Sequence, residues 1–332
     1  MAPARSRTAL LAGALAATAA LGLASLPARA ESVEDHLAAA KNAAAFDFTG
    51  TLARICIHPQ TAPGGDKPPN AWPPRDAWAA EPAKVFDNLY FVGTKIHSSW
   101  ALTASDGGII LIDTLYEYAS EEAIAGGLRK LGLDPKNVKY TIISHAHGDH
   151  VAGARLMQQT YKSRIVMGDK DWAMIEQSVY AYPNGKPIRD ITASDGQVIT
   201  VGDVSVRLVS TPGHTPDTYS MIFQVKDGGK PLTVAYNGGT AFNFVNDVPH
   251  FDIYISSQRK MGKTAADAGA TVLMTNHSEF DNAVAKIKMM AARKPGEPSP
   301  FELGSGAVQR YFKVTEECAL AARLKLVNGV VD

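Results

Sequence analysis

Short apolar runs recur along the chain from Val85 onward and alternate with longer stretches of helical periodicity. Alternating or continuous apolar runs of four to eight residues are typical of strands, and a 3.6-residue period is typical of helices. The predicted strands are 85–92, 99–103, 108–112, 138–143, 164–167, 197–201, 204–210, 219–225, 232–236 and 271–274. The predicted helices are 33–45, 121–131, 152–161, 170–178, 253–268, 280–292 and 307–326. This order predicts an α/β fold in which two mixed β-sheets pack face to face with helices outside.

The first thirty residues have the pattern of a secretory signal peptide. Arg5 and Arg7 precede an Ala/Leu-rich run over 8–26, and Ala28-Arg29-Ala30 offers small residues at a cleavage site. We therefore expect cleavage before Glu31 and a periplasmic or secreted protein. A retained membrane anchor is the alternative, although the run barely reaches the roughly 20 apolar residues that a membrane span needs.

Three regions follow from these patterns: a signal peptide over 1–30, an N-terminal extension over 31–84 and a catalytic domain over 85–327. The extension contains a Pro/Gly-rich segment over 59–74, which excludes regular structure there. It either wraps over the main domain or remains a disordered linker.

The charge and composition of the chain limit the kinds of binding partner that we expect. Lys plus Arg and Asp plus Glu number 33 each, so no net field attracts nucleic acid or an anionic membrane. We expect a small-molecule substrate, no nucleic acid, no membrane contact after signal cleavage, and a monomer.

The chain has two cysteines, Cys56 and Cys318, and neither belongs to a Cys-x-x-Cys pair. In an oxidising compartment they are expected to form one disulfide, whereas in the cytosol they would be free thiols in the core.

Four potential metal ligands are concentrated in one segment between a predicted strand and a predicted helix, Ser144-His145-Ala146-His147-Gly148-Asp149-His150. Imidazole and carboxylate groups together suit zinc or a similar ion. His145 and His147 lie two apart on extended backbone and face one side, whereas Asp149 and His150 enter the turn. This arrangement favours two metal ions over one.

His-x-His-x-Asp-His is the signature of the metallo-β-lactamase superfamily, which this chain resembles. The family's pattern continues with a histidine after a later strand, here His214, and a final histidine near the C-terminus, here His277. The resemblance implies the αβ/βα sandwich of that family and two Zn²⁺ ions per chain. The implied ligands are His145, His147 and His214 for the first ion, and Asp149, His150 and His277 for the second.

This ligand set is similar to that of subclass B3 β-lactamases. Related glyoxalase II, lactonase and RNase Z enzymes place a metal-bridging Asp after the strand that corresponds to 232–236, and subclass B1 enzymes place a Cys there. In this chain Gly239 stands at about that position. The resemblance thus implies a β-lactamase that opens the ring by attack of a metal-bound hydroxide, with Asp149 as the catalytic residue that orients it. A metallohydrolase of another ester, lactone or amide is the alternative.

Substrate contacts are predicted on the rim of this site. Gly239 and Ala241 replace serines that are usual in subclass B3, so we expect a high KM. We expect Gly239→Ser to lower KM if the strand end can accept a side chain. Thr240, Trp100 and Phe242 are the predicted substrate contacts. Asp113, at a strand end, either supports a ligand histidine through a hydrogen bond or caps a turn.

Overall fold

The computed structural model describes residues 1–2, 31–57, 72–179, 182–242, 244 and 246–329. The predicted signal peptide and most of the predicted Pro/Gly-rich segment therefore lie outside the described residues. Ser32–Asp332 forms one compact unit. Among the helices of the described residues, none is both long and apolar enough to cross a bilayer.

Two β-sheets form the centre of this unit. The first has the strand order β1-β2-β3-β4-β5-β6-β7, antiparallel from β1 to β4 and parallel from β4 to β7. Its strands are β1 Ala83–Phe86, β2 Leu89–Phe91, β3 Trp100–Thr103, β4 Ile109–Ile112, β5 Val138–Ile142, β6 Arg164–Met167 and β7 Ile191–Thr192.

The second sheet has the order β12-β11-β10-β9-β8, in which only the β11–β12 pair is parallel. Its strands are β8 Val198–Val201, β9 Val204–Ser210, β10 Tyr219–Asp227, β11 Lys230–Asn237 and β12 Val272–Thr275. Both sheets are mixed, and together they confirm the predicted sandwich.

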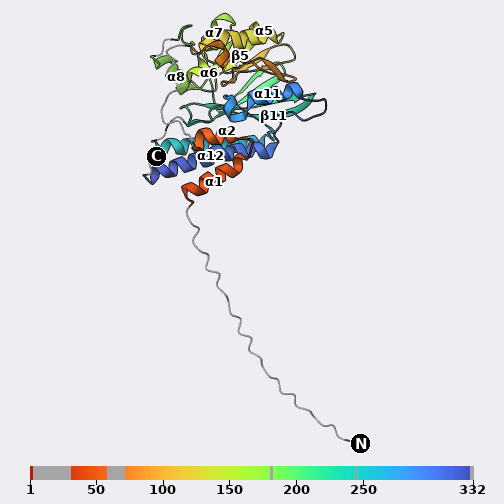
Figure 1. Ribbon diagram of the computed structural model, residues 1–332, viewed down its shortest axis with the longest axis vertical. Coiled ribbons are helices and arrows are strands. Elements are labelled where there is room, and N and C mark those ends of the chain that lie inside the picture. The colour runs from red at the N-terminus through yellow and green to blue at the C-terminus, as the bar shows by residue number, and fades with distance from the viewer. Residues whose placement is uncertain (3–30, 58–71, 180–181, 243, 245, 330–332) are drawn as a thin grey trace. The chain divides into compact units, whose positions relative to one another are not determined.

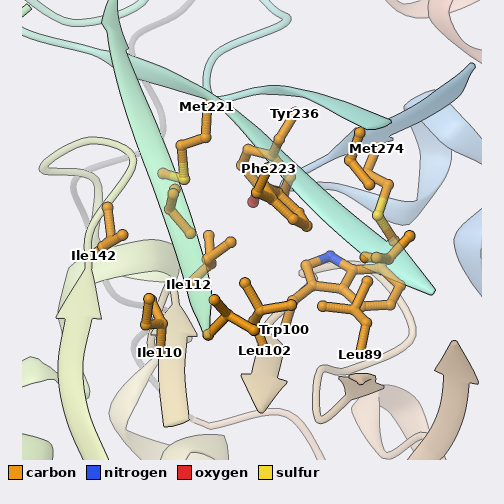
Figure 2. Close-up of a cluster of buried hydrophobic side chains, with 14 of the residues drawn as sticks. Leu89, Trp100, Leu102, Ile110, Ile112, Ile142, Met221, Phe223, Tyr236 and Met274 are labelled. Carbon is orange, nitrogen blue, oxygen red and sulfur yellow. The ribbon is translucent and has the colours of Figure 1, made fainter. Parts of the chain in front are cut away.

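The two sheets face each other across an apolar core, which Figure 2 shows in close-up. Ile110 and Ile112 of β4 point toward Met221 and Phe223 of β10. Because side chains alternate along a strand, the other face of β4 is buried as well, under helices that contact Leu111. Burial on both faces explains why the sequence of this strand is a continuous run of apolar residues.

Helices cover the outer face of each sheet (Figure 1). The first sheet carries α4 Glu117–Ala119, a π-helix Ser120–Gly126, α5 Gly127–Lys130, a 3₁₀ turn Pro135–Asn137, α6 Gly148–Val151, α7 Ala154–Thr160 and α8 Asp169–Gln177. The remaining helices are α1 Val33–Ala44, α2 Thr49–Leu52, a π-helix Ala53–Ile57, α3 Arg75–Trp78, α9 Val248–Asp267, α10 Ser278–Asp281, α11 Ala283–Ala292 and α12 Ser305–Val327.

The described part of the N-terminal extension packs into the helical layer over the second sheet. Ala40 and Ala44 of α1 are fully buried in the same apolar cluster as α9 and α12. Ser32 begins α1 with a capping box that includes Asp35. The predicted disulfide is confirmed: Cys56, after α2, bonds to Cys318 of α12, with their Cα atoms 4.9 Å apart.

Three boundaries differ from the predicted elements. The expected strand over 85–92 is split into β1 and β2 by a turn. The expected helix over 280–292 is split at Asn282, whose φ of 59° is left-handed. Helix α9 begins five residues before its predicted start, because Asp247 caps it with a hydrogen bond from the His250 amide.

Candidate metal centre

One tight turn carries four of the predicted ligands. It follows β5, and it carries residues that are each at most 8% exposed: His145, His147, Asp149 and His150. His147 has extended backbone and is the N-cap of α6, whereas Asp149 and His150 belong to the first turn of that helix. The change from strand to helix therefore sends the first two side chains and the last two in different directions, as the sequence predicts.

The first imidazole group consists of His145, His147 and His214. His214 comes from the β9–β10 loop, and its Nε2 lies 3.0 Å from Nε2 of His145 and 3.1 Å from Nδ1 of His147. The preceding Gly213 has a φ of 135°, and a Cβ there would lie 2.7 Å from the Cα of Tyr254, so this approach requires glycine.

Backbone carbonyl groups orient two of these rings. Nδ1 of His145 donates to the Gly238 carbonyl over 2.8 Å, and Nδ1 of His214 donates to the Ala241 carbonyl. A carbonyl oxygen only accepts, so each Nδ1 carries the proton and, in the neutral ring, each Nε2 is a bare lone pair. Burial, together with neighbouring imidazoles, lowers the pKa of both rings well below the usual 6.5.

The spacing and the protonation of these ring nitrogens show whether the first imidazole group fits a metal ion. Two bare Nε2 atoms at 3.0 Å repel each other unless a cation lies between them. Tetrahedral zinc, with Zn–N bonds of 2.0–2.1 Å, places its donor atoms about 3.3 Å apart. The observed spacings are close to this value, so the three imidazoles fit such an ion.

The second group, which we call the mixed group, consists of His97, Asp149, His150 and His277. The Asp149 Oδ2 atom lies 3.2 Å from Nε2 of His150, 3.1 Å from Nε2 of His277 and 3.5 Å from Nε2 of His97. His277 follows β12, and its Nε2 lies 3.1 Å from that of His150. One carboxylate and three imidazoles thus converge, a donor set that suits a first-row divalent ion.

Asp113 supports the mixed group from behind. It follows β4 with a left-handed φ of 61°, a conformation that non-glycine residues rarely adopt. Its carboxylate accepts hydrogen bonds from the Ser144 amide (2.7 Å), the Ser144 hydroxyl (2.9 Å), the Tyr236 hydroxyl (3.1 Å) and Nδ1 of His150 (3.1 Å). Of the two predicted roles, hydrogen bonding to a histidine of the site is the one that the structure shows.

The mixed group is charged in the metal-free chain. Burial alone would lower the pKa of His150, but Asp149 and Asp113 outweigh it and raise that pKa to about 10. Burial opposes ionisation of Asp149 as well, yet the adjacent His150 and His277 hold the pKa of this carboxyl well below its usual range. Burial lowers the pKa of His97 to about 3, against the opposing effect of Asp149.

Gly238 and Gly239 pack directly under the first imidazole group. A Cβ at Gly239 would lie 2.5 Å from the Cβ of His214, closer than real Cβ atoms approach, and it would make a tight contact of 3.0 Å with Cγ2 of Thr218. The position therefore accepts neither a carboxylate nor a serine without moving His214. The condition on which Gly239→Ser was expected to lower KM, that the strand end accepts a side chain, is therefore not met.

The three predicted substrate contacts are wrong, because all of them are buried. Trp100 is fully buried between the sheets, where it packs edge-on against Phe91. Phe242 is 2% exposed in the helical layer. Thr240 is 1% exposed, and its hydroxyl is hydrogen-bonded to that of Tyr311 over 2.6 Å. None of these three side chains is therefore exposed for contact with a substrate.

Two residues near the site were assigned no individual role from the sequence. His97 lies on the β2–β3 hairpin tip, and a lone histidine in a loop gives little signal. Asp171 of α8 is fully buried and accepts hydrogen bonds from the Ala146 amide (2.8 Å), the Thr215 hydroxyl (2.8 Å) and the Asp217 amide (3.1 Å). It thereby ties the loop of His145 and His147 to that of His214, and burial raises its pKa to about 6.

Comparison with known proteins agrees with this geometry. The sequence profile of the Metallo-beta-lactamase superfamily matches residues 92–227. BJP-1, a subclass B3 metallo-beta-lactamase of Bradyrhizobium japonicum, has a similar structure, with a TM-score of 0.65 and 26% identity over 76% of this chain and 98% of that one. The chain thus resembles the metallo-β-lactamase superfamily in both sequence and structure. The predicted resemblance to the superfamily and to its subclass B3 is thus confirmed.

Sequence relatives within the superfamily carry other names. A hydroxyacylglutathione hydrolase of Rhodopseudomonas palustris is 32% identical over 93 residues, which are 27% of this chain and 32% of that protein. An N-acyl homoserine lactonase of Bacillus sp is 26% identical over 148 residues, 43% of this chain and 56% of that protein. The matched part of the chain thus spans about a third to a half of the length of these curated relatives.

Proposed function

We propose that this chain is a zinc-dependent hydrolase that binds two ions and opens the β-lactam ring. The observation that carries the proposal is Gly239: at about the position where lactonases and glyoxalase II place a bridging carboxylate, a Cβ would meet His214 at 2.5 Å. A site without that carboxylate and with five histidines and one aspartate resembles subclass B3. The similarity to BJP-1 over 98% of its length supports the same class.

In this proposal His145, His147 and His214 hold the first ion, and Asp149, His150 and His277 hold the second. When bound, zinc would act as a Lewis acid and would lower the pKa of a coordinated water molecule. Gly238, Ala241 and Asp113 fix the ring orientations through hydrogen bonds, which keeps the donor atoms aimed at the ions. Asp149, at the centre of the mixed group, is placed to orient the attacking water and to accept its proton.

A second candidate is hydrolysis of a thioester, lactone or other ester. It is favoured by the names of the sequence relatives, a hydroxyacylglutathione hydrolase and an N-acyl homoserine lactonase. Both chemistries use an activated water molecule and differ in the group that leaves.

A substrate panel on zinc-loaded protein separates the two candidates. We expect turnover of a penicillin, a cephalosporin or a carbapenem, abolished by a chelator and restored by zinc. The buried Thr240 and the close fit at Gly239 offer no side chain to bind the drug's carboxylate, so we expect a high KM rather than a low kcat. Turnover of a lactone or a thioester with every β-lactam left intact would favour the second candidate.

Export to the periplasm or medium is part of the proposal. It is supported by the Arg-flanked apolar run that ends at Ala30 and by the disulfide between Cys56 and Cys318, a bond typical of oxidising compartments. Mass spectrometry of protein from the native host should find a mature N-terminus at or near Glu31. Protein that retains Met1 would contradict this.

A further inference from the structure

A seventh potential ligand atom reaches the metal centre from the β2–β3 hairpin. The side chain of His97 is only 14% exposed, and its Nε2 lies 3.5 Å from Oδ2 of Asp149. Its ring centroid lies 5.1 Å from that of His277, at an interplanar angle of 82°. The ligand atoms of His97, Asp149 and His277 all lie within 4.8 Å of one another, close enough for one ion to contact all three.

The backbone holds His97 in this place. His97 and His277 form an antiparallel β-bridge, although 180 positions separate them in sequence. Hydrogen bonds flank the bridge on both sides: the Ser98 amide donates to the Asn276 carbonyl over 2.9 Å, and the Ser278 amide donates to the Ile96 carbonyl over 2.7 Å. The hairpin tip is therefore docked on the segment that presents His277, so the two imidazoles are positioned together.

The side chain of His97 is oriented as well. Tyr116 packs edge-on against its ring, with centroids 5.3 Å apart and an interplanar angle of 85°. The ring of His97 therefore has edge-on contacts with both Tyr116 and His277, and its Nε2 lies 3.5 Å from Oδ2 of Asp149. Lys95 and Ile96, the neighbours of His97 at the tip, are exposed instead.

We propose that His97 is a fourth protein ligand of the second zinc ion, beside Asp149, His150 and His277. This inference rests on the proposed function, which assigns a second ion to the mixed group. Four protein donors are typical of closed zinc sites, whereas three leave a position open for water or substrate. The open position then belongs to the first imidazole group, and the hairpin is joined to the metal centre through His97.

The test compares zinc affinities of the wild type with those of His97→Phe. Phenylalanine keeps an aromatic ring against Tyr116 but offers no ligand atom. The matched control is His250→Phe, because His250 lies outside both groups and stacks on Phe244 with centroids 3.6 Å apart. Loss of a residue that only orients a ligand typically lowers metal affinity by roughly 10- to 100-fold, so loss of a direct ligand should lower it by more than about 100-fold. Competition with a chromophoric zinc chelator should show that loss for the second ion of His97→Phe, with the first ion and the control unchanged.

A spectroscopic readout counts the ligands directly. In cobalt-substituted protein each coordinated imidazole that keeps its N–H gives a hyperfine-shifted proton resonance. His97→Phe should lose one such resonance, and His250→Phe should lose none. The melting temperature of the metal-free proteins shows whether His97→Phe folds, and His97→Leu serves as the second variant if it does not.

The possible outcomes separate the two proposals. If the wild type binds two ions and both His97 variants keep the second-ion affinity and the full set of shifted resonances, His97 is no ligand. The dinuclear assignment would survive that result. If the wild type binds a single ion under zinc excess, the mixed group holds no metal, and both the proposed function and the role of His97 are overturned.

Discussion

Two imidazoles of the first group are oriented by backbone carbonyls, whereas His150 in the mixed group is oriented by a carboxylate. Gly238 and Ala241 accept from His145 and His214, which burial keeps neutral. In the mixed group, Asp149 and Asp113 surround His150 and raise its pKa to about 10. In the metal-free chain, His145 and His214 of the first imidazole group are thus neutral, whereas His150 of the mixed group is a cation.

This difference has a chemical consequence for metal binding. A histidine ligates only through an unprotonated nitrogen, so metal binding competes with protonation. His145 and His214 present bare nitrogens at neutral pH, whereas Nε2 of His150 must first lose a proton. The carboxylates that hold that proton also favour a divalent cation in its place, because they compensate positive charge of either kind.

Changing Gly239 should damage the first imidazole group selectively. In Gly239→Ser the new Cβ would lie 2.5 Å from the Cβ of His214, so this ring must shift. We expect first-ion affinity to fall on the order of 100-fold, with a smaller effect on the second ion, measured by chelator competition. Gly239→Ala should behave in the same way, because the clash arises from Cβ and not from the hydroxyl.

Gly306→Ser is the matched control, since a Cβ there meets nothing within 4 Å. If Gly239→Ser keeps both ions and lowers KM, the strand end accepts a side chain after all. Our account of the close contact under His214 would then be incorrect.

Much of the fold could be predicted because some strands are buried on both faces, such as Ile109–Ile112, and others alternate between buried and exposed residues, such as Val198–Val201. The core strand Ile109–Ile112 and the ligand loop after Val138–Ile142 follow from local pattern alone. The prediction that Trp100 contacts the substrate failed because Trp100 is the first residue of β3, where its side chain already points between the sheets. Only a few residues separate the hairpin tip from the strand that follows it. Because side chains alternate in direction along a strand, a small error in position changes where a side chain points.

The rest of the site depends on contacts that are distant in sequence. His97 joins the mixed group through its bridge with His277, and Asp171 ties together loops about 70 residues apart. The absence of a bridging carboxylate was visible in the sequence. The reason, that a Cβ at Gly239 would strike His214, required coordinates.

The most direct test of the two-site account is a zinc titration of metal-free protein at pH 9 and at pH 7. The account predicts two ions per chain at pH 9. Because the pKa of His150 is raised to about 10, the proton it must release becomes harder to remove as the pH falls, so second-ion affinity should drop about tenfold per pH unit. First-ion affinity should stay constant, since His145 and His214 are already neutral at both values. A single ion at pH 9, or two affinities that fall together, would contradict the account.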